Sequence, residues 1–214
     1  MQKDNISKSV IRRLPRYYRF LGGLLKQGIT KISSRELSEM MRLTASQIRQ
    51  DLNCFGGFGQ QGYGYNVAEL RGEIAKILGL DVTEKVIIIG AGNLGRAITM
   101  HIDFAKYGYE LSGIFDSNAA KENGDISGIT VMHTDRLADF CSANSPTMAV
   151  LCIPRAGAKE IVEKLRELGV NAFWNFSHYD ILFDFPDAIV ENVHLTDSLM
   201  TLSYAAKRSS DDTE

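Results

Sequence analysis

The chain has 214 residues, of which 44% are hydrophobic and 23% are charged, and its formal net charge is −2 at pH 7. These values are ordinary for a soluble globular protein with one large or two small domains. They exclude a membrane-spanning chain, because no apolar run approaches the length needed to cross a bilayer, and the N-terminus lacks the apolar core of a signal peptide.

The cysteines indicate the cellular compartment of the protein, and the charge distribution indicates a kind of partner. The three cysteines, Cys54, Cys141 and Cys152, are far apart and lack C-x-x-C spacing, which indicates reduced cytoplasmic thiols, with a redox role as the alternative. Residues 1–81 contain 13 Lys and Arg against 7 Asp and Glu, a charge of +6, whereas the remainder contains 11 against 19, a charge of −8. A basic segment joined to an acidic one suggests a polyanion-binding module on a separate body, although surface charge also varies by chance.

Residues 8–27 are predicted to form an amphipathic helix. Arg12, Arg16 and Arg19 fall together on its polar face, and Pro15 should bend the helix or mark a late start. The apolar face consists of Val10, Leu14, Tyr17, Leu21, Leu24 and Leu25.

Two short helices joined by a tight turn are expected next. The first opens at Ser33 or Ser34 with a capping box, residues 42–43 form the turn, and Thr44 opens the second, in which Gln47 would complete another capping box. This arrangement is typical of a helix-turn-helix.

The second of these helices has an outward polar stripe whose side chains can read base edges in a major groove. The stripe comprises Ser46, Arg49, Gln50 and Asn53. A solvated helix face that binds nothing would have the same pattern. The glycine- and aromatic-rich residues 55–65, with Gln60 and Gln61 at the tip, resemble a β-hairpin wing, and this favours a winged-helix DNA-binding domain.

Residues 85–116 carry the pattern on which the second half of the chain is organised. Four apolar residues, 86–89, predict a strand buried on both faces. Gly90, Gly92 and Gly95 follow at the G-x-G-x-x-G spacing that places a pyrophosphate on the next helix N-terminus. Asp116 closes a second apolar run 21 residues after Gly95, where an acid that binds ribose is expected. The alternative is a glycine-rich turn that binds nothing.

The residues around Asp116 bear on the choice of nucleotide. Asp116 is followed by Ser117 and Asn118 rather than by Arg or Lys, and a carboxylate repels a 2′-phosphate. NAD(H) is therefore favoured over NADP(H).

The rest of the second domain continues to alternate between strands and helices. Pro154 follows one of these strands at the edge where open parallel sheets bind ligands, so it either forms a pocket wall or only ends the strand. The expected strands are 129–132, 148–153, 171–174 and 189–193, and the expected helices are 135–141 and 156–168. A further helix, 67–78, is expected before this domain and connects it to the first one.

A C-terminal helix over residues 195–206 would be apolar on two sides, with Leu195, Leu199 and Leu202 on one and Met200 and Tyr204 nearly opposite. Such a helix needs two surfaces to cover it. Insertion between two subunits as a swapped element, or a wedge within one monomer, would satisfy this need.

Several kinds of chemistry are missing from the sequence. The four histidines are scattered and no metal-ligand spacing is present, so no metal is expected. After the nucleotide domain too little chain remains for a substrate domain. We therefore expect a protein that is not an enzyme and that uses the nucleotide as a signal.

Three stretches carry a close resemblance to a known family: VIRRLPRYYRFL, SSRELSEMMRLTASQIRQDLNCFGGFGQQGYGYNV and VIIIGAGNLG. The chain resembles the Rex family of bacterial redox-sensing transcriptional repressors over nearly its whole length. The resemblance implies a winged-helix DNA-binding domain (1–80), a Rossmann NAD(H)-binding domain with a parallel sheet (81–194) and a swapped C-terminal helix and tail (195–214). It also implies a homodimer that binds palindromic double-stranded operator DNA and releases it when NADH binds, with NAD⁺ competing for the same site.

The resemblance assigns roles to residues by position. The cofactor residues are Gly90, Ala91, Gly92, Asn93, Leu94 and Gly95 at the pyrophosphate and Asp116 at the adenosine ribose. Pro154 is a further candidate, because it follows a strand at the ligand-binding edge of the sheet. The DNA-binding residues are Arg13 and Arg16 at phosphates, Ser46, Gln47, Arg49 and Gln50 at the major groove, and Gly59, Gln60 and Gln61 at the wing tip. A switch would involve Arg19, with His101 and His194 standing where well-studied members have Tyr and Asp.

Three other functions stay open from the sequence. One is an NAD(H)-dependent oxidoreductase with an N-terminal adaptor, which the missing substrate domain disfavours. Another is a CoA-binding module, which Asp116 weakly disfavours because CoA carries a 3′-phosphate on its adenosine ribose. The last is an interaction module whose basic helix binds protein, which would lack the steep salt dependence of phosphate contacts.

Overall fold

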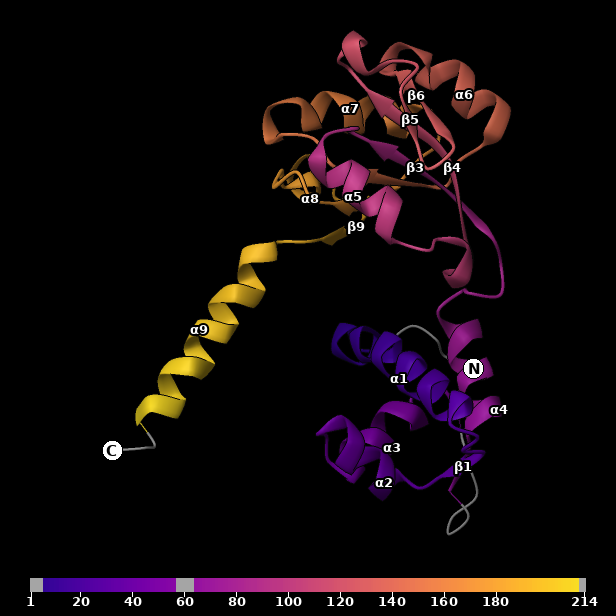
Figure 1. Cartoon of the computed structure of the whole chain (residues 1–214), viewed down its shortest axis with the longest axis vertical. Coiled ribbons are helices and arrows are strands. Elements are labelled where there is room, and N and C mark those ends of the chain that lie inside the picture. Colours follow the sequence, from indigo (N-terminus) through magenta and orange to yellow (C-terminus); the bar gives the residue numbers. More distant parts are fainter. Residues whose placement is uncertain (1–5, 57–63, 212–214) are drawn as a thin grey trace. The chain divides into compact units, whose positions relative to one another are not determined.

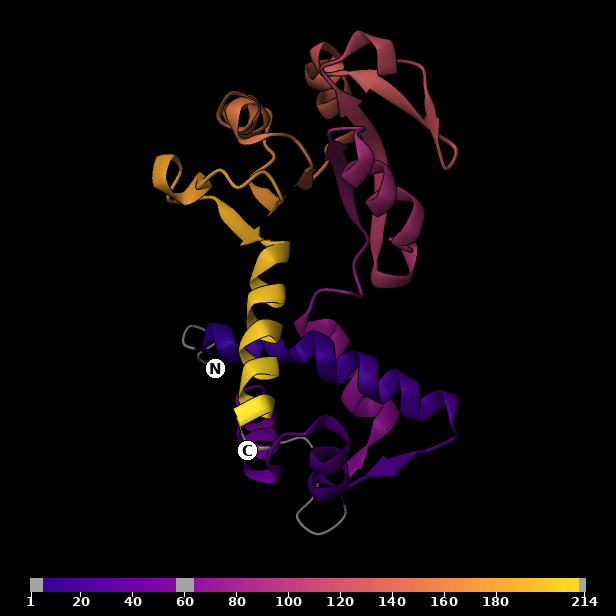
Figure 2. The same cartoon turned by 60° about the vertical axis from the view of Figure 1, so that its left-hand side comes forward.

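A computed structural model describes residues 6–56 and 64–211, with side chains up to residue 208. The chain divides into two compact units, Met1–Val82 and Thr83–Glu214, which are described separately below. Figure 1 labels elements of each unit, and Figure 2 shows the same trace from another side. Within the described residues, no helix is both long and apolar enough to cross a membrane.

In its described residues, 6–56 and 64–82, the first unit has four helices and a small antiparallel ribbon. Its elements are α1 (Lys8–Lys26), β1 (Lys31–Ile32), α2 (Ser34–Met41), α3 (Ala45–Asn53), β2 (Tyr65–Asn66) and α4 (Val67–Ile77). One buried cluster joins all four helices, with Leu14 and Leu21 of α1 packed among residues such as Leu37, Ile48 and Ile74. Most of the predicted apolar stripe of the first helix therefore lies in the core of this unit.

Helix α1 runs through Pro15 without a break, so the late start allowed by the sequence is wrong. The helix begins earlier because Ser7 caps it and accepts a hydrogen bond from the Val10 amide. Proline lacks an amide hydrogen and therefore loses one helical hydrogen bond, but Leu14 and Tyr17 on either side are fully buried and hold the helix in place.

The helix-turn-helix forms as predicted, with one difference in its caps. Ser33 and Glu36 make the expected capping box at the start of α2. Thr44 accepts the Gln47 amide hydrogen at the start of α3. The second capping box is wrong, because the Gln47 side chain donates to Asp51, one turn further along α3, instead of returning to the cap.

The predicted wing lies largely outside the described residues, since 57–63 are not described, and with them the wing-tip residues Gly59, Gln60 and Gln61. Tyr65, the last residue of the predicted wing, lies in β2, which pairs antiparallel with β1. Gly64 has φ +71°, and a Cβ there would lie 2.7 Å from the Ile32 carbonyl oxygen, so this position requires glycine.

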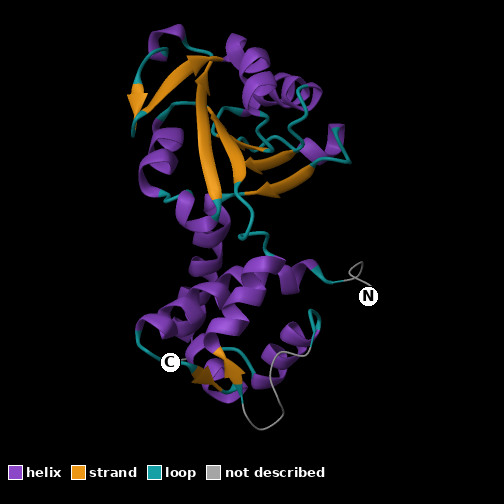
Figure 3. Ribbon diagram, turned by 90° about the vertical axis from the view of Figure 1, so that its right-hand side faces the viewer, coloured by secondary structure: helices purple, strands orange, loops and turns teal. Residues whose placement is uncertain are grey.

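The second unit is an α/β layer structure around a seven-stranded sheet (Figure 3). The strand order is β5-β6-β4-β3-β7-β8-β9, in which only β5 is antiparallel to its neighbour. The strands are β3 (Glu84–Ile89), β4 (Tyr109–Asp116), β5 (Asp125–Ile126), β6 (Ile129–His133), β7 (Met148–Leu151), β8 (Ala172–Asn175) and β9 (Ile189–Asn192). The helices are α5 (Asn93–His101), α6 (Leu137–Asn144), α7 (Arg155–Glu167), α8 (Ile181–Asp184) and α9 (Leu195–Asp211), with single 3₁₀ turns at Ala105–Tyr107, Ala119–Lys121 and Thr134–Arg136.

Alternate residues of β3 pack on opposite faces of this sheet. Ile87 and Ile89 lie in a cluster with residues of α6, α7 and α8, whereas Val86 and Ile88 lie in a second cluster with Ile98 of α5. The four-residue apolar run therefore belongs to a central strand that is covered on both faces, as the sequence predicts. The expected strand 148–153 ends earlier, at Leu151.

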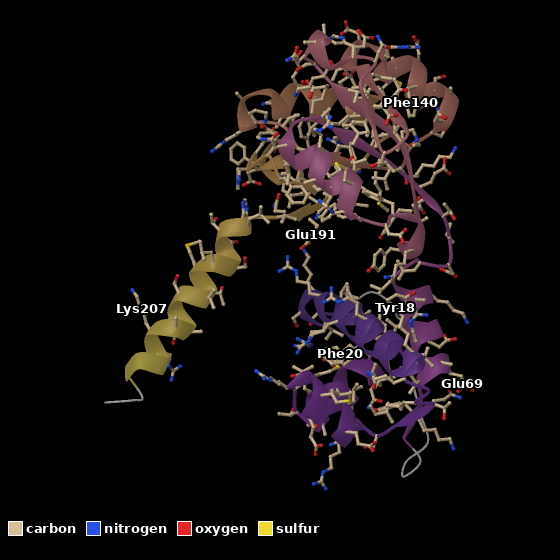
Figure 4. All side chains as sticks on the ribbon, in the orientation of Figure 1. Tyr18, Phe20, Glu69, Phe140, Glu191 and Lys207 are labelled. Atoms are coloured by element: carbon tan, nitrogen blue, oxygen red, sulfur yellow. The ribbon has the colours of Figure 1, made fainter. Side chains whose placement is uncertain are left out.

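Helix α9 differs from every other helix of this unit. All of its side chains from Leu195 to Arg208 are exposed, including Leu199, Met200 and Tyr204, each at least 61% accessible. Figure 4 shows the side chains of α9, among them the labelled Lys207, projecting from the ribbon. The apolar character on two sides that the sequence predicts is present, and the second unit does not cover it.

Candidate nucleotide pocket and DNA-binding surface

The three glycines of the turn after β3 are required for different reasons. Gly90 has φ +104°, and a Cβ there would lie 2.4 Å from the Cys152 carbonyl oxygen. A Cβ on Gly95 would lie 1.9 Å from the Gly90 carbonyl oxygen. A Cβ on Gly92 would meet nothing within 4 Å, so Gly92 leaves open space in front of the backbone, where a ligand can approach.

The first turn of α5 presents free backbone donors to that space. Gly92 is the N-cap and supplies no side-chain hydrogen bond, so the amides of the first turn, including those of Asn93 and Leu94, keep their donors for a ligand. The positive end of the helix dipole lies at the same position, and both effects favour an anion such as a pyrophosphate.

A cavity of about 580 Å³ opens at this turn, a size that suits a nucleotide. Four of the predicted cofactor residues line it: Gly90, Gly92, Asp116 and Pro154. Ala91 reaches the site through its backbone, whereas Gly95 is buried against the turn. Pro154 follows β7 as the N-cap of α7, so it forms part of the wall as well as ending the strand segment.

Asp116 is the buried carboxylate of this pocket, with 8% of its surface exposed. Its Oδ2 accepts from the Ala91 amide at 2.8 Å and from Lys121 Nζ at 2.8 Å, and its Oδ1 accepts from the Asn118 amide at 2.9 Å. Burial alone would raise the pKa of Asp116, but these hydrogen bonds and the lysine charge outweigh it and lower the pKa below its usual value. The group is therefore an anion at neutral pH, fixed at the end of β4.

The pocket is also lined by two lysines that the sequence did not predict as cofactor residues. Lys121 pairs with Asp116 from the short turn after β4, and Lys164 of α7 donates to the Thr134 carbonyl at 3.1 Å. The prediction of NAD(H) over NADP(H) rests on Ser117 and Asn118, the two residues directly after Asp116, and Lys121 lies beyond them. The five-residue separation of Asp116 and Lys121 across a polar turn was the signal available for the first, and nothing local marks the second.

The cysteines make no disulfide. Burial raises the pKa of Cys152, which lines the pocket, to about 12, and it also raises the pKa of Cys141. Both thiols therefore stay protonated and weakly reactive at neutral pH.

In the first unit, α3 presents three of its predicted base-reading side chains to solvent. Ser46, Arg49 and Gln50 are exposed, and Arg49 donates to the Ser34 hydroxyl of α2 at 3.1 Å. This is an exposed polar face with both donors and acceptors, as major-groove readout requires. Gln47 is half-buried.

Gln47 and the predicted phosphate contact Arg13 both turn inward to Asp51, which is 1% exposed. Arg13 makes a bidentate ion pair with it, through Nε at 2.6 Å and Nη2 at 2.7 Å. Tyr17 and Gln47 each donate to it at 2.8 Å. Burial by itself would raise the pKa of Asp51, but the donors lower it, so the carboxylate is ionised.

Arg16, the second predicted phosphate contact, also makes contacts within its unit. It donates to the Met41 carbonyl at the end of α2, and its guanidinium lies 5.8 Å from the centre of the Phe20 ring. Phe20 and Tyr18 of α1 are labelled in Figure 4.

The three predicted switch residues are all exposed. Arg19 belongs to α1 of the first unit, and His101 ends α5 of the second. His194 lies just before α9, where its Nδ1 is 2.8 Å from Nδ1 of His178 and the two rings are stacked. No cluster of three or more metal-ligating side chains occurs among residues 6–56 and 64–211.

Both halves of the chain match known protein families. Residues 5–53 match the family described as putative DNA-binding protein N-terminus, and residues 81–179 match the CoA binding domain. The redox-sensing transcriptional repressor Rex of Thermoanaerobacter pseudethanolicus is 53% identical, over 95% of this chain and 90% of that protein. The protein of the same name from Clostridioides difficile is 52% identical, over 95% of this chain and 96% of its own length.

Solved structures of a Rex-family repressor, RSP, are also similar to this chain over nearly its whole length. The structure of RSP in complex with β-NAD⁺ and operator DNA is 51% identical, with a TM-score of 0.89, over 99% of this chain and 97% of that one. The structure of RSP with β-NADH is 48% identical, with a TM-score of 0.89, over 99% of both chains. The predicted fold class, a DNA-binding N-terminal domain followed by a Rossmann-like domain with a largely parallel sheet, is thereby confirmed, while the swapping of the C-terminal helix stays a prediction.

Proposed function

The chain belongs to the Rex family of redox-sensing transcriptional repressors, and from that membership we propose that it is a DNA-binding repressor that senses the NADH/NAD⁺ ratio. One observation carries this proposal. Relatives about half identical in sequence match both units at once, and an RSP structure that matches nearly the full chain contains both β-NAD⁺ and operator DNA. A nucleotide pocket and a DNA-reading helix on one chain are what such a sensor needs.

We assign the cofactor to the cavity after β3. The pyrophosphate would lie over Gly92 and the first turn of α5, because the donors there are uncapped and the space is open. The adenosine ribose would lie near Asp116 and Lys121, and Pro154 would border the pocket on the side of α7. Bound NAD(H) supplies the redox signal, which is whether its nicotinamide ring carries a positive charge.

That charge explains how the two forms differ. Burying a charged ring is costly without a partner, so neutral NADH enters a closed pocket more readily than NAD⁺ does. The cofactor shifts DNA affinity only through its different affinity for the two states of the protein. We propose a homodimer in which NADH stabilises the state whose two α3 helices no longer match successive turns of DNA, about 34 Å apart.

On the DNA side, the exposed face of α3 would read bases through Ser46, Arg49 and Gln50. Arg19, His101 and His194 stay the proposed switch residues on the strength of the family resemblance. Because operator DNA is the proposed partner, we expect the protein to act in the cytoplasm, with the nucleotide as a signal and not as a substrate.

The test is fluorescence anisotropy with a labelled palindromic operator at fixed salt. NADH is expected to release the protein at lower concentration than NAD⁺, and NAD⁺ is expected to oppose the effect of NADH. A scrambled duplex serves as the control for binding without sequence preference. Equal release by the two forms, or equal binding to the scrambled duplex, would contradict the proposal.

A second candidate follows from the match of residues 81–179 to the CoA binding domain and from the two pocket lysines. Lys121 neutralises Asp116, which weakens the repulsion of a ribose phosphate. Competition between CoA and NADH, followed by NADH fluorescence, tests this candidate. Displacement of NADH by CoA at similar concentration would support it, and no displacement would leave NADH as the ligand.

A further inference from the structure

We propose that Asp51 is a positioning residue for the DNA-reading helix, and that Arg13 affects DNA binding by holding Asp51 and not by touching a phosphate. This inference rests on the proposed function. It changes the role of one predicted DNA contact and gives a role to a buried acid within a DNA-binding unit.

The geometry joins two helices through one side chain. Arg13 and Tyr17 lie one turn apart on α1, and Gln47 and Asp51 lie one turn apart on α3. Arg13 holds both carboxylate oxygens of Asp51, at 2.6 and 2.7 Å, and Tyr17 and Gln47 donate to one oxygen each at 2.8 Å. Four hydrogen bonds to one carboxylate fix the rotation of α3 against α1.

Burial makes the loss of any one of these hydrogen bonds costly. Asp51 is 1% exposed and Tyr17 is fully buried, so water cannot replace a lost partner. Removing one partner of a buried charge pair leaves the other charge uncompensated, and the helix must shift to solvate it. A shift of α3 moves Ser46, Arg49 and Gln50 together, since all three lie on this helix.

The same contact occupies Arg13. Its Nε and Nη2 both point to Asp51, and only 26% of its side chain is exposed. A guanidinium bound in this way has its Nε/Nη2 edge, one of the two edges that can match a phosphate, already filled. One hydrogen of the Gln47 amide nitrogen is likewise donated to Asp51, which leaves its second hydrogen and its oxygen for a base edge.

The charge of Asp51 makes the expected direction of the change in DNA affinity a test of the proposal. Removing a negative charge from a protein that binds polyanionic DNA should strengthen binding if charge alone matters. If Asp51 positions α3, its removal should weaken binding in spite of the gain in net positive charge. The two readings therefore predict opposite changes for Asp51→Asn.

The experiment uses the full-length protein and a palindromic operator, with affinity measured by anisotropy over a series of salt concentrations. The variants are Asp51→Asn, Arg13→Met and the double variant, with Glu73→Gln as the matched control because Glu73 makes only an exposed ion pair with Lys76 on α4. Thermal unfolding and NADH binding are measured on every variant. The milder Tyr17→Phe removes one of the four hydrogen bonds and serves if Asp51→Asn fails to fold.

We expect Asp51→Asn to bind operator about tenfold more weakly or worse, in line with the loss of one or more base contacts. Arg13→Met should weaken operator binding while keeping the wild-type slope of log affinity against log salt concentration. The double variant should bind operator as tightly as whichever single variant has the lower affinity, because both substitutions remove the same contact. Tyr17→Phe should weaken binding less, again with an unchanged slope. Glu73→Gln should bind at least as tightly as the wild type.

Three results would overturn the inference. The first is a salt slope for Arg13→Met that falls by about 0.9, the signature of one lost phosphate contact. The second is an additive double variant, and the third is operator binding by folded Asp51→Asn or Tyr17→Phe that equals or exceeds the wild type. Failure of the wild type to bind any palindrome would instead overturn the proposed function.

Discussion

Individual residues decide what the glycine turn after β3 can do. Gly90 and Gly95 are glycines because a Cβ would collide with backbone, and Gly92 is a glycine although nothing in the protein lies within 4 Å of its Cβ position. The first two positions therefore serve the fold, and the third serves an approaching ligand. A substitution series can separate the two roles.

Gly92→Ala is expected to leave the free energy of unfolding within about 0.5 kcal/mol of wild type, because its φ of −78° suits alanine and the space is open. The added methyl group occupies the approach of the pyrophosphate, so NADH affinity should fall at least about tenfold. Isothermal titration calorimetry and urea unfolding measure the two effects. Gly90→Ala is the contrasting control and should lose stability as well, and a Gly92→Ala protein with wild-type NADH affinity would refute the assignment.

Acid stability tests the state of Asp51 at the same scale. Its pKa is lowered in the folded protein, so its contribution to stability is present above the unfolded-state pKa of about 3.9 and is lost as the pH falls through the lower, folded pKa. We expect the wild type to lose more unfolding free energy between pH 6 and pH 3 than Asp51→Asn does. Urea unfolding at both pH values measures this, and equal losses would show that Asp51 does not retain its charge in the folded state.

At the scale of elements, caps and turns define the DNA-reading helix. Arg42 adopts a left-handed conformation with φ 53° that ends α2, and Thr44 then opens α3 by accepting the Gln47 amide hydrogen at 3.1 Å. Both signals are local, and this explains why the sequence predicts the helix-turn-helix with nearly correct bounds. The orientation of the Gln47 side chain depends on Asp51 and α1, which are contacts from outside the local pattern.

Thr44→Ala is expected to lower the free energy of unfolding of the first unit by about 1 kcal/mol, because it removes a side-chain cap. Thr44→Ser retains the hydroxyl and should stay close to wild type. Urea unfolding followed by far-ultraviolet circular dichroism measures both variants. An alanine variant as stable as the serine variant would mean that the cap contributes nothing to α3.

At the scale of the whole molecule, the proposed function requires coupling between a nucleotide pocket in one unit and a DNA-reading helix in the other. Coupling between binding sites is reciprocal. If NADH weakens operator binding, operator DNA must weaken NADH binding by the same factor. That requirement holds whatever the path between the units is.

We expect operator DNA to weaken NADH binding about 5- to 150-fold, the range of typical allosteric coupling. NADH titrations with and without saturating operator measure the factor, and a scrambled duplex is the control. The factor must equal the one obtained from operator titrations with and without NADH. Equal NADH affinity in the presence and absence of operator would exclude the proposed sensing.

The exposed helix α9 gives a second prediction for the whole molecule. Removing residues 195–214 should leave the unfolding of the sheet unit unchanged, because all α9 side chains from 195 to 208 are exposed in this chain. The proposed dimer should be weakened, since the exposed Leu199 and Met200 would lose the partner surface that covers them. Light scattering after gel filtration measures the mass, with Lys207→Ala as a control, and an unchanged mass would contradict a role of α9 in assembly.

The sequence by itself determined the features that depend on neighbours along the chain: the helix caps, the strand–glycine–helix turn, the acid at the end of the next strand and the two-sided apolar character of the last helix. Periodicity and backbone sterics act over a few residues, and a single sequence displays them directly. Only the tertiary structure decided which partners the charged side chains choose. Arg13 and Asp51 are 38 residues apart, Lys164 reaches Thr134 across 30 residues, and His178 meets His194 across 16. Such pairings follow from the packing of whole helices and strands, and in the case of Asp51 burial also selects a partner, Arg13, that compensates its charge.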